Sequence, residues 1–149
     1  MILPADDCLP TTILQIEKRL FDIYQQLLSH FGPQHWWPAD EPFEVIVGAV
    51  LTQSASWVNV EKGIRNLKQA EALSPQSLRK MLHAELAALI HPCGYYNAKT
   101  IKLKAFAEWF GERFGDRLEI MFAGDAAELR EELLGVYGIG QETADSILL

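Results

Sequence analysis

Apolar residues recur at every third or fourth position along most of this 149-residue chain, and glycine or proline interrupts each run. The first run extends from Ile13 to Phe31. This spacing places the apolar side chains on one face of an α-helix and does not suit the two-residue period of a strand. Thr12 and Gln15 form a capping-box pattern at its start, and Gly32-Pro33 predicts its end. The pattern therefore predicts an all-α fold.

Later segments of the sequence are also expected to form helices. The segment FEVIVGAVLTQ (43–53) is rich in β-branched residues, which also suits a strand. Pro42 before it is typical of the first turn of a helix, so we interpret the segment as a buried helix between helical neighbours. Further helices are expected at 57–70, at 76–90 after the start signal Ser74-Pro75, from Asn97 to Phe114 with Gly115 as its end, and at 126–134 after Asp125. Residues 1–149 are expected to form a single helical domain.

Composition narrows the class of protein. A chain that is 49% hydrophobic can bury one core, yet its longest apolar run, Val45–Leu51, is far shorter than the roughly 20 residues that a membrane span needs. The N-terminus has no basic segment typical of a secretory signal, so we expect a cytoplasmic protein without a membrane partner. Neither the two cysteines nor the four histidines show metal-ligand spacing, so no metal site is predicted.

The net charge of −7 counts against nucleic acid as a partner, because phosphate contacts dominate DNA affinity. Two groups of basic residues could still offset that charge locally. We interpret both as solvated helix faces; they are Lys99, Lys102 and Lys104, and Lys62, Arg65 and Lys68. Charge alone therefore leaves the partner open.

The last fifteen residues, GVYGIGQETADSILL (135–149), contain a glycine turn between two helical segments. Gly138 and Gly140 allow positive φ and close approach to a ligand, and Ile139 between them is expected to plug into the helices. The N–H groups of the turn and of the next helix would point outward as an anion site suited to phosphate. On its own, however, a Gly-x-Gly pattern is as typical of an ordinary tight turn.

Three segments together resemble one family. The residues from Gly138 to Asp145 are similar to the helix-hairpin-helix signature of the endonuclease III-type (HhH-GPD) DNA glycosylases, and the resemblance extends over PFEVIVGAVLTQSASWVNV and GYYNAKTIKLKAF. It implies an all-α HhH-GPD bundle ending in a helix-hairpin-helix motif at about 126–149, with double-stranded DNA carrying a damaged base as partner. It also allows a monovalent cation at the hairpin; whether an iron–sulfur cluster is present cannot be judged from these residues.

The resemblance assigns roles to particular residues. The hairpin positions Gly138, Ile139, Gly140, Gln141 and Thr143 would contact DNA phosphates. Gln53 would enter the gap left by a flipped base, although it could equally be a polar helix cap. Lys99 would contact a phosphate or be solvated. An alkylated purine is cationic and stacks well on aromatic rings, so a base pocket is expected from Trp36, Trp37, Pro38 and Trp57, which could instead be core residues. Tyr95 and Tyr96 are interpreted as packing residues.

Glu142 stands where the bifunctional members of the family carry a nucleophilic lysine, and a carboxylate cannot form an imine. The resemblance therefore favours a monofunctional base-excision repair glycosylase, closest to the 3-methyladenine enzymes. A non-catalytic DNA-binding or protein-interaction module and an oxidised-pyrimidine glycosylase are the alternatives. The family's catalytic aspartate would lie beyond Leu149, so we expect no catalytic residue within these residues, little activity, and self-association through the apolar end.

Overall fold

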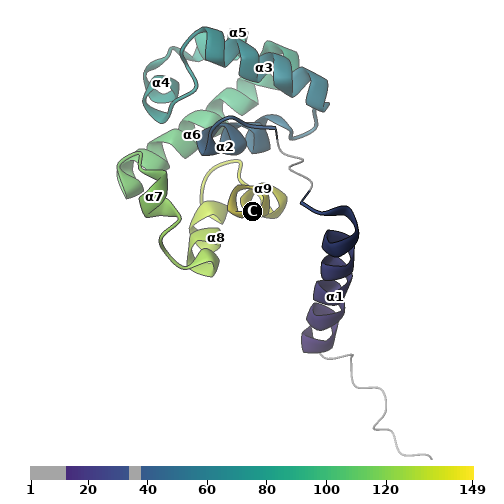
Figure 1. The fold of residues 1–149 in the computed structure, drawn as a ribbon. Helices are drawn as coiled ribbons and strands as arrows, with labels where there is room; N and C mark the ends of the chain where they lie inside the picture. Colours follow the sequence, from purple (N-terminus) through teal and green to yellow (C-terminus); the bar gives the residue numbers. More distant parts are fainter. Residues whose placement is uncertain (1–12, 34–37) are drawn as a thin grey trace, which may run out of the picture. The chain divides into compact units, whose positions relative to one another are not determined.

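The computed structural model describes residues 13–33 and 38–149, and every regular element in these ranges is a helix (Figure 1). The predicted all-α fold is therefore confirmed. The elements are α1 (Ile13–Phe31), α2 (Pro42–Leu51), α3 (Trp57–Gln69), α4 (Pro75–Lys80), α5 (His83–Leu89), the 3-10 turn η1 (His91–Cys93), α6 (Tyr96–Phe114), α7 (Leu118–Met121), α8 (Ala126–Leu134) and α9 (Gln141–Leu148). None of the described helices is both long and apolar enough to cross a membrane.

The chain divides into two compact units, residues 1–38 and 39–149, where the sequence predicts a single domain. Helix α1 in the first unit is amphipathic as predicted. Its large apolar side chains remain about half exposed or more. They are Ile16, Leu20, Phe21, Ile23, Tyr24, Leu27 and Phe31.

Helix α2 forms the centre of the second unit, with α3, α6 and α9 packed around it. Val50 and Leu51 are fully buried, and the Phe43 ring lies 6.3 Å from that of Phe110 and 6.5 Å from that of Phe106 on α6. Each such side chain removed from water contributes about 1.5–3 kcal/mol. Contact on all sides explains why this helix is apolar around most of its circumference, and its interpretation as a buried helix is confirmed.

The single helix predicted over 76–90 is wrong, because the structure contains two helices there. Met81 and Leu82 adopt extended backbone angles between α4 and α5. Lys104 of α6 fixes this break: its Nζ donates to the carbonyl oxygens of Leu78 (2.9 Å), Arg79 (2.9 Å) and Met81 (2.6 Å). These acceptors are the open carbonyl groups at the C-terminus of α4.

Several predicted helix ends are confirmed by their caps. Ser74 Oγ accepts from the Ser77 N–H at 3.2 Å, and Asp125 Oδ1 accepts from the N–H groups of Ala127 and Glu128. Gly115 ends α6 with φ of 61°. A bidentate pair between Arg79 and Asp116 then fixes α4 against the end of α6, with oxygen–nitrogen distances of 2.5 and 2.7 Å.

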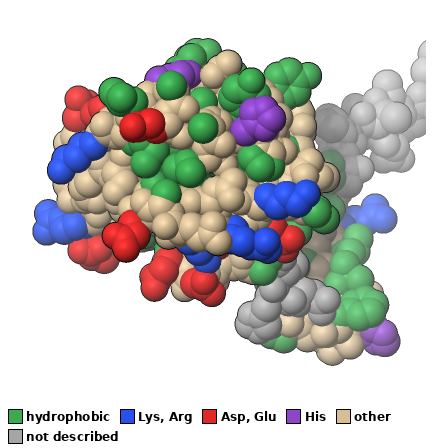
Figure 2. Space-filling model, turned by 90° about the horizontal axis from the view of Figure 1, so that it is seen from above, with side chains coloured by type: hydrophobic (Ala, Val, Ile, Leu, Met, Phe, Trp, Pro, Cys, Tyr) green, Lys and Arg blue, Asp and Glu red, His purple; other side chains and the backbone are tan. Residues whose placement is uncertain are grey.

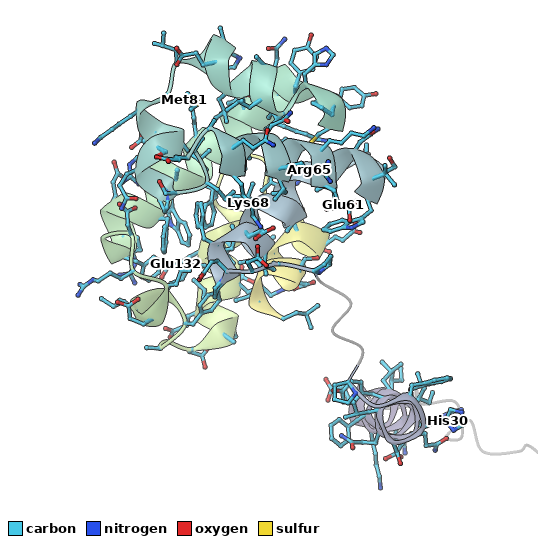
Figure 3. All side chains as sticks on the ribbon, turned by 45° about the horizontal axis from the view of Figure 1, so that its top comes forward. His30, Glu61, Arg65, Lys68, Met81 and Glu132 are labelled. Carbon is cyan, nitrogen blue, oxygen red and sulfur yellow. The ribbon has the colours of Figure 1, made fainter. Side chains whose placement is uncertain are left out.

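The basic residues of α3 are not all a solvated face. Lys68 (labelled in Figure 3) lies over the start of α2, where its Nζ is 2.6 Å from Asp40 Oδ2 and 2.8 Å from Glu44 Oε2. The Lys68 ammonium lowers the pKa of Asp40 through this hydrogen bond. The lysine therefore serves to hold α3 on α2 and neutralises the buried Glu44.

Candidate nucleic-acid interface

Helices α8 and α9 pack on each other and are joined by the glycine turn, next to α2 (Figure 1). Gly138 has φ of 85°, in the left-handed region that favours glycine. Gly140 is extended instead, with φ of −95° and ψ of 178°, and it precedes α9 without a side-chain cap. Only the first of the two glycines is therefore required by its own backbone conformation.

The turn is anchored to the core from inside. Ile139 is 5% exposed, and its N–H donates to the Val136 carbonyl at 3.1 Å. The expectation that Ile139 plugs into the helices is confirmed. On the surface Arg130 of α8 pairs with Asp145 of α9 at 2.6 Å, and this hydrogen bond lowers the pKa of Asp145. The two helices are thus held together on both sides of the turn.

Four consecutive N–H groups at the start of α9 have no acceptor within the described parts of the chain. They belong to Gly140, Gln141, Glu142 and Thr143, and we call them the hairpin N–H groups. The first paired amide is that of Ala144, which donates to the Gly140 carbonyl at 2.9 Å. A Cβ added at Gly140 would meet nothing within 4 Å, so this backbone is open to a ligand. Unpaired N–H groups at the positive end of a helix dipole are suited to an anion such as phosphate.

Gln53, in the loop between α2 and α3, holds the hairpin in place. Its Nε2 donates to the Gly138 carbonyl at 3.0 Å and to Thr143 Oγ1 at 2.9 Å, while its Oε1 accepts from Lys102 Nζ at 2.5 Å. All three contacts are internal, and the Thr143 side chain is only 7% exposed. In this structure Gln53 therefore acts within the protein, and Thr143 can offer a ligand its backbone N–H but not its hydroxyl. Insertion of Gln53 into DNA stays a prediction that would require these bonds to break.

Lys99 does not lie at the surface. It is 2% exposed, and its Nζ donates to the carbonyls of Leu51 (2.9 Å) and Cys93 (2.8 Å). Burial lowers the pKa of its ammonium. The prediction that Lys99 contacts a phosphate is therefore wrong: the side chain passes through the core and satisfies the C-terminal end of α2 instead.

The prediction that Tyr95 is a packing residue is also wrong. Its side chain is 76% exposed, and its φ of 46° is left-handed, which is uncommon for an aromatic residue. Ser54, one residue after Gln53, is likewise exposed, with φ of 53°. Such conformations persist only where the surroundings impose them and cluster at ligand sites. Tyr96, by contrast, packs as predicted, with its ring 4.6 Å from that of His91.

Lys99 and Gln53 bring three loops together at one end of the second unit. Lys99 joins the end of α2 to the turn before Tyr95, and Gln53 joins the next loop to the hairpin. No regular spacing in the sequence signals Tyr95 or Ser54, which lie close in the chain to Cys93 and Gln53, two residues that take part in these contacts.

The described residues do not test the predicted base pocket. Trp36 and Trp37 lie outside them, and Pro38 is exposed at the end of the first unit. Trp57 is half-buried at the start of α3, where its Nε1 donates to Glu61 Oε1 at 2.9 Å. The pocket stays a prediction.

The described residues contain no cluster of three or more His, Cys, Asp or Glu side chains that could hold a metal ion. A monovalent cation would use backbone oxygens instead. The Val136, Gly138 and Gly140 carbonyls each accept one hydrogen bond in the structure, and each keeps a second lone pair. These oxygens fit the predicted cation, which stays a prediction.

An all-α unit that presents a glycine hairpin with open N–H groups belongs to the class of helix-hairpin-helix proteins. Residues 47–141 match the model of the HhH-GPD superfamily base excision DNA repair proteins, and the chain is a member of that family. The match covers the loop of Gln53 and the glycine turn, and it ends at the first residue of α9.

Curated relatives agree with this membership. A protein of Methanocaldococcus jannaschii whose name describes a DNA repair glycosylase is 44% identical over 133 residues, which is 89% of this chain and 60% of that protein. Endonuclease III of Thermotoga maritima is 27% identical over 85% of this chain and 54% of its own length. The chain thus spans a little over half the length of each of these two relatives.

Solved structures show the same fold. The 3-methyladenine DNA glycosylase of H. pylori bound to 1,N6-ethenoadenine superposes with a TM-score of 0.69 at 31% identity, over 90% of this chain and 62% of that one. A trapped endonuclease III–DNA covalent intermediate superposes with a TM-score of 0.68 at 18% identity, over 89% and 58% of the two chains, and shows the fold alone.

Proposed function

We propose that the chain is the DNA-gripping part of a base-excision DNA repair glycosylase. The observation that carries this proposal is the row of four hairpin N–H groups, open to solvent at Gly140 and anchored from behind by Gln53. A phosphate oxygen accepts well from such a row because the bonds are charge-assisted and the donors are already in position.

Backbone donors also reconcile DNA binding with a net charge of −7. The face of the second unit over α3 and α5 shows Lys and Arg side chains interspersed with Asp and Glu, rather than a basic patch (Figure 2). DNA bound through a few phosphates at the hairpin gives a shallow dependence of affinity on salt, since that slope counts the phosphates neutralised. The exposed Tyr95 is then available to stack on a nucleobase close to the gripped strand.

For the chemistry we propose monofunctional hydrolysis of the glycosidic bond of an alkylated purine. Glu142, exposed in the first turn of α9, cannot form the imine that a strand-cutting lyase requires. The likeness to the H. pylori 3-methyladenine glycosylase supports this substrate class over oxidised pyrimidines. The flipped base would stack on the Trp57 ring at the start of α3.

The test uses the longest natural protein that contains these residues, with methylated DNA and with DNA containing an oxidised pyrimidine. We expect release of 3-methyladenine, no strand cleavage, and no covalent adduct after borohydride treatment. An adduct with the oxidised substrate would contradict the monofunctional assignment. Binding without release of either base would support a non-catalytic module on the same scaffold.

A further inference from the structure

We infer that Lys102 is the ammonium group that neutralises the phosphate held by the hairpin N–H groups. This inference rests on the proposed function and adds a side chain to that site. Lys102 lies on α6, half-buried, and runs along the hairpin: a Cβ placed on Gly138 would come within 2.3 Å of its Cγ and 2.9 Å of its Cε. The space beside Gly138 is thus filled by the lysine stem, whereas the space beside Gly140 is open.

The three lysines of α6 differ in how many hydrogen bonds their ammonium groups donate within the protein. Lys104 donates to three carbonyls and Lys99 to two, and both are fixed by the fold. Lys102 has one acceptor within the described residues, the neutral amide oxygen of Gln53 at 2.5 Å, and no carboxylate within ion-pair distance. An ammonium group has three donors, so two remain for a ligand.

Gln53 sets where this charge lies. Both donor bonds of its amide go to the hairpin, to the Gly138 carbonyl and to Thr143 Oγ1, and its oxygen must then face Lys102. The ammonium is therefore held beside the hairpin before any ligand arrives, so little side-chain entropy is lost on binding.

The charges around the hairpin make such a cation necessary. Glu142 carries an exposed carboxylate in the first turn of α9, while Asp145 is already paired with Arg130. A phosphate approaching the hairpin N–H groups is repelled by the Glu142 carboxylate, and the Lys102 ammonium offsets that repulsion.

The experiment measures binding of the 149-residue chain to a short duplex with a stable abasic-site analogue, over a range of KCl concentrations. Lys102→Met keeps the stem against Gly138 and removes the charge, and Lys102→Arg keeps the charge. Lys80→Met, at an exposed lysine of α4, is the matched control. We expect Lys102→Met to bind about tenfold more weakly at low salt and to lower the salt slope by about 0.9, the value for one phosphate. Lys102→Arg and Lys80→Met should keep the wild-type slope.

Thermal unfolding of each variant shows whether it is folded, and Lys102→Gln repeats the test if Lys102→Met is not. An unchanged slope in a folded Lys102→Met or Lys102→Gln variant, with or without weaker binding, overturns the inference and leaves the hairpin assignment standing. If the wild-type chain does not bind the duplex, the proposed function fails, and the inference fails with it.

Discussion

Replacing each hairpin glycine by alanine distinguishes a glycine that is required for stability from one that is required for DNA binding. At Gly140 the backbone is extended and a methyl group would meet nothing within 4 Å. We therefore expect Gly140→Ala to change the free energy of unfolding by no more than about 1 kcal/mol, the usual difference between glycine and alanine before a helix.

We expect the same methyl group to obstruct a phosphate that approaches the hairpin N–H groups through the open space at Gly140. Hydrogen bonds to a charged group contribute about 1.5–3 kcal/mol each, so loss of one bond weakens DNA binding by about tenfold or more. Gly140→Ala should therefore leave the melting temperature almost unchanged and reduce affinity for duplex DNA, as measured by fluorescence anisotropy.

Gly138→Ala should behave differently, because this substitution lowers the stability of the folded protein. The left-handed φ of 85° costs about 1–2 kcal/mol for alanine, and the methyl group would also overlap the Lys102 stem, at 2.3 Å from its Cγ. The melting temperature should fall together with DNA affinity. Wild-type affinity in folded Gly140→Ala would refute the assignment of the hairpin as the phosphate site.

Three further substitutions test the buried polar contacts. Gln53→Glu cannot donate to the Gly138 carbonyl, so hydrogen exchange of the Ile139 amide, which donates to the Val136 carbonyl, should accelerate and DNA binding weaken. Unchanged exchange at Ile139 would show that Gln53 does not hold the turn. Lys99→Met leaves two buried carbonyls unpaired and should lower stability in urea titrations by about 1–3 kcal/mol, with the same salt slope for DNA; a shallower slope would restore Lys99 as a phosphate contact. Arg79 lowers the pKa of Asp116, so the pair stabilises the fold above the unfolded pKa of about 3.9 and this contribution is lost as the pH falls through the lower folded value. Asp116→Asn should flatten that acid limb of stability, and an identical pH profile would contradict the role of the pair.

The sequence predicts helices best where their ends carry a local signal. Ser74, Asp125 and Gly115 mark ends that the structure confirms. The break between α4 and α5 has no glycine or proline and depends on Lys104, which is distant in the sequence. The short helix α7 (Leu118–Met121) spans too few residues to show a period.

In the candidate site too, the sequence predicts the features that depend on neighbouring residues and misses those that depend on distant contacts. The glycines and Ile139 predict the hairpin, because the turn depends on residue types at neighbouring positions in the sequence. The inward direction of Lys99 and the internal bonds of Gln53 depend on where α2, α6 and α9 meet, and residue types along a chain do not specify that meeting point.

In the proposed function, the N–H groups of Gly140 to Thr143 donate hydrogen bonds to a DNA phosphate. Amide chemical shifts of the isotope-labelled chain, followed while duplex DNA is added, test it directly. The largest shifts are expected at these four amides, and they should be lost in Gly140→Ala. Shifts that concentrate on another surface of the second unit, with these amides unmoved, would contradict it.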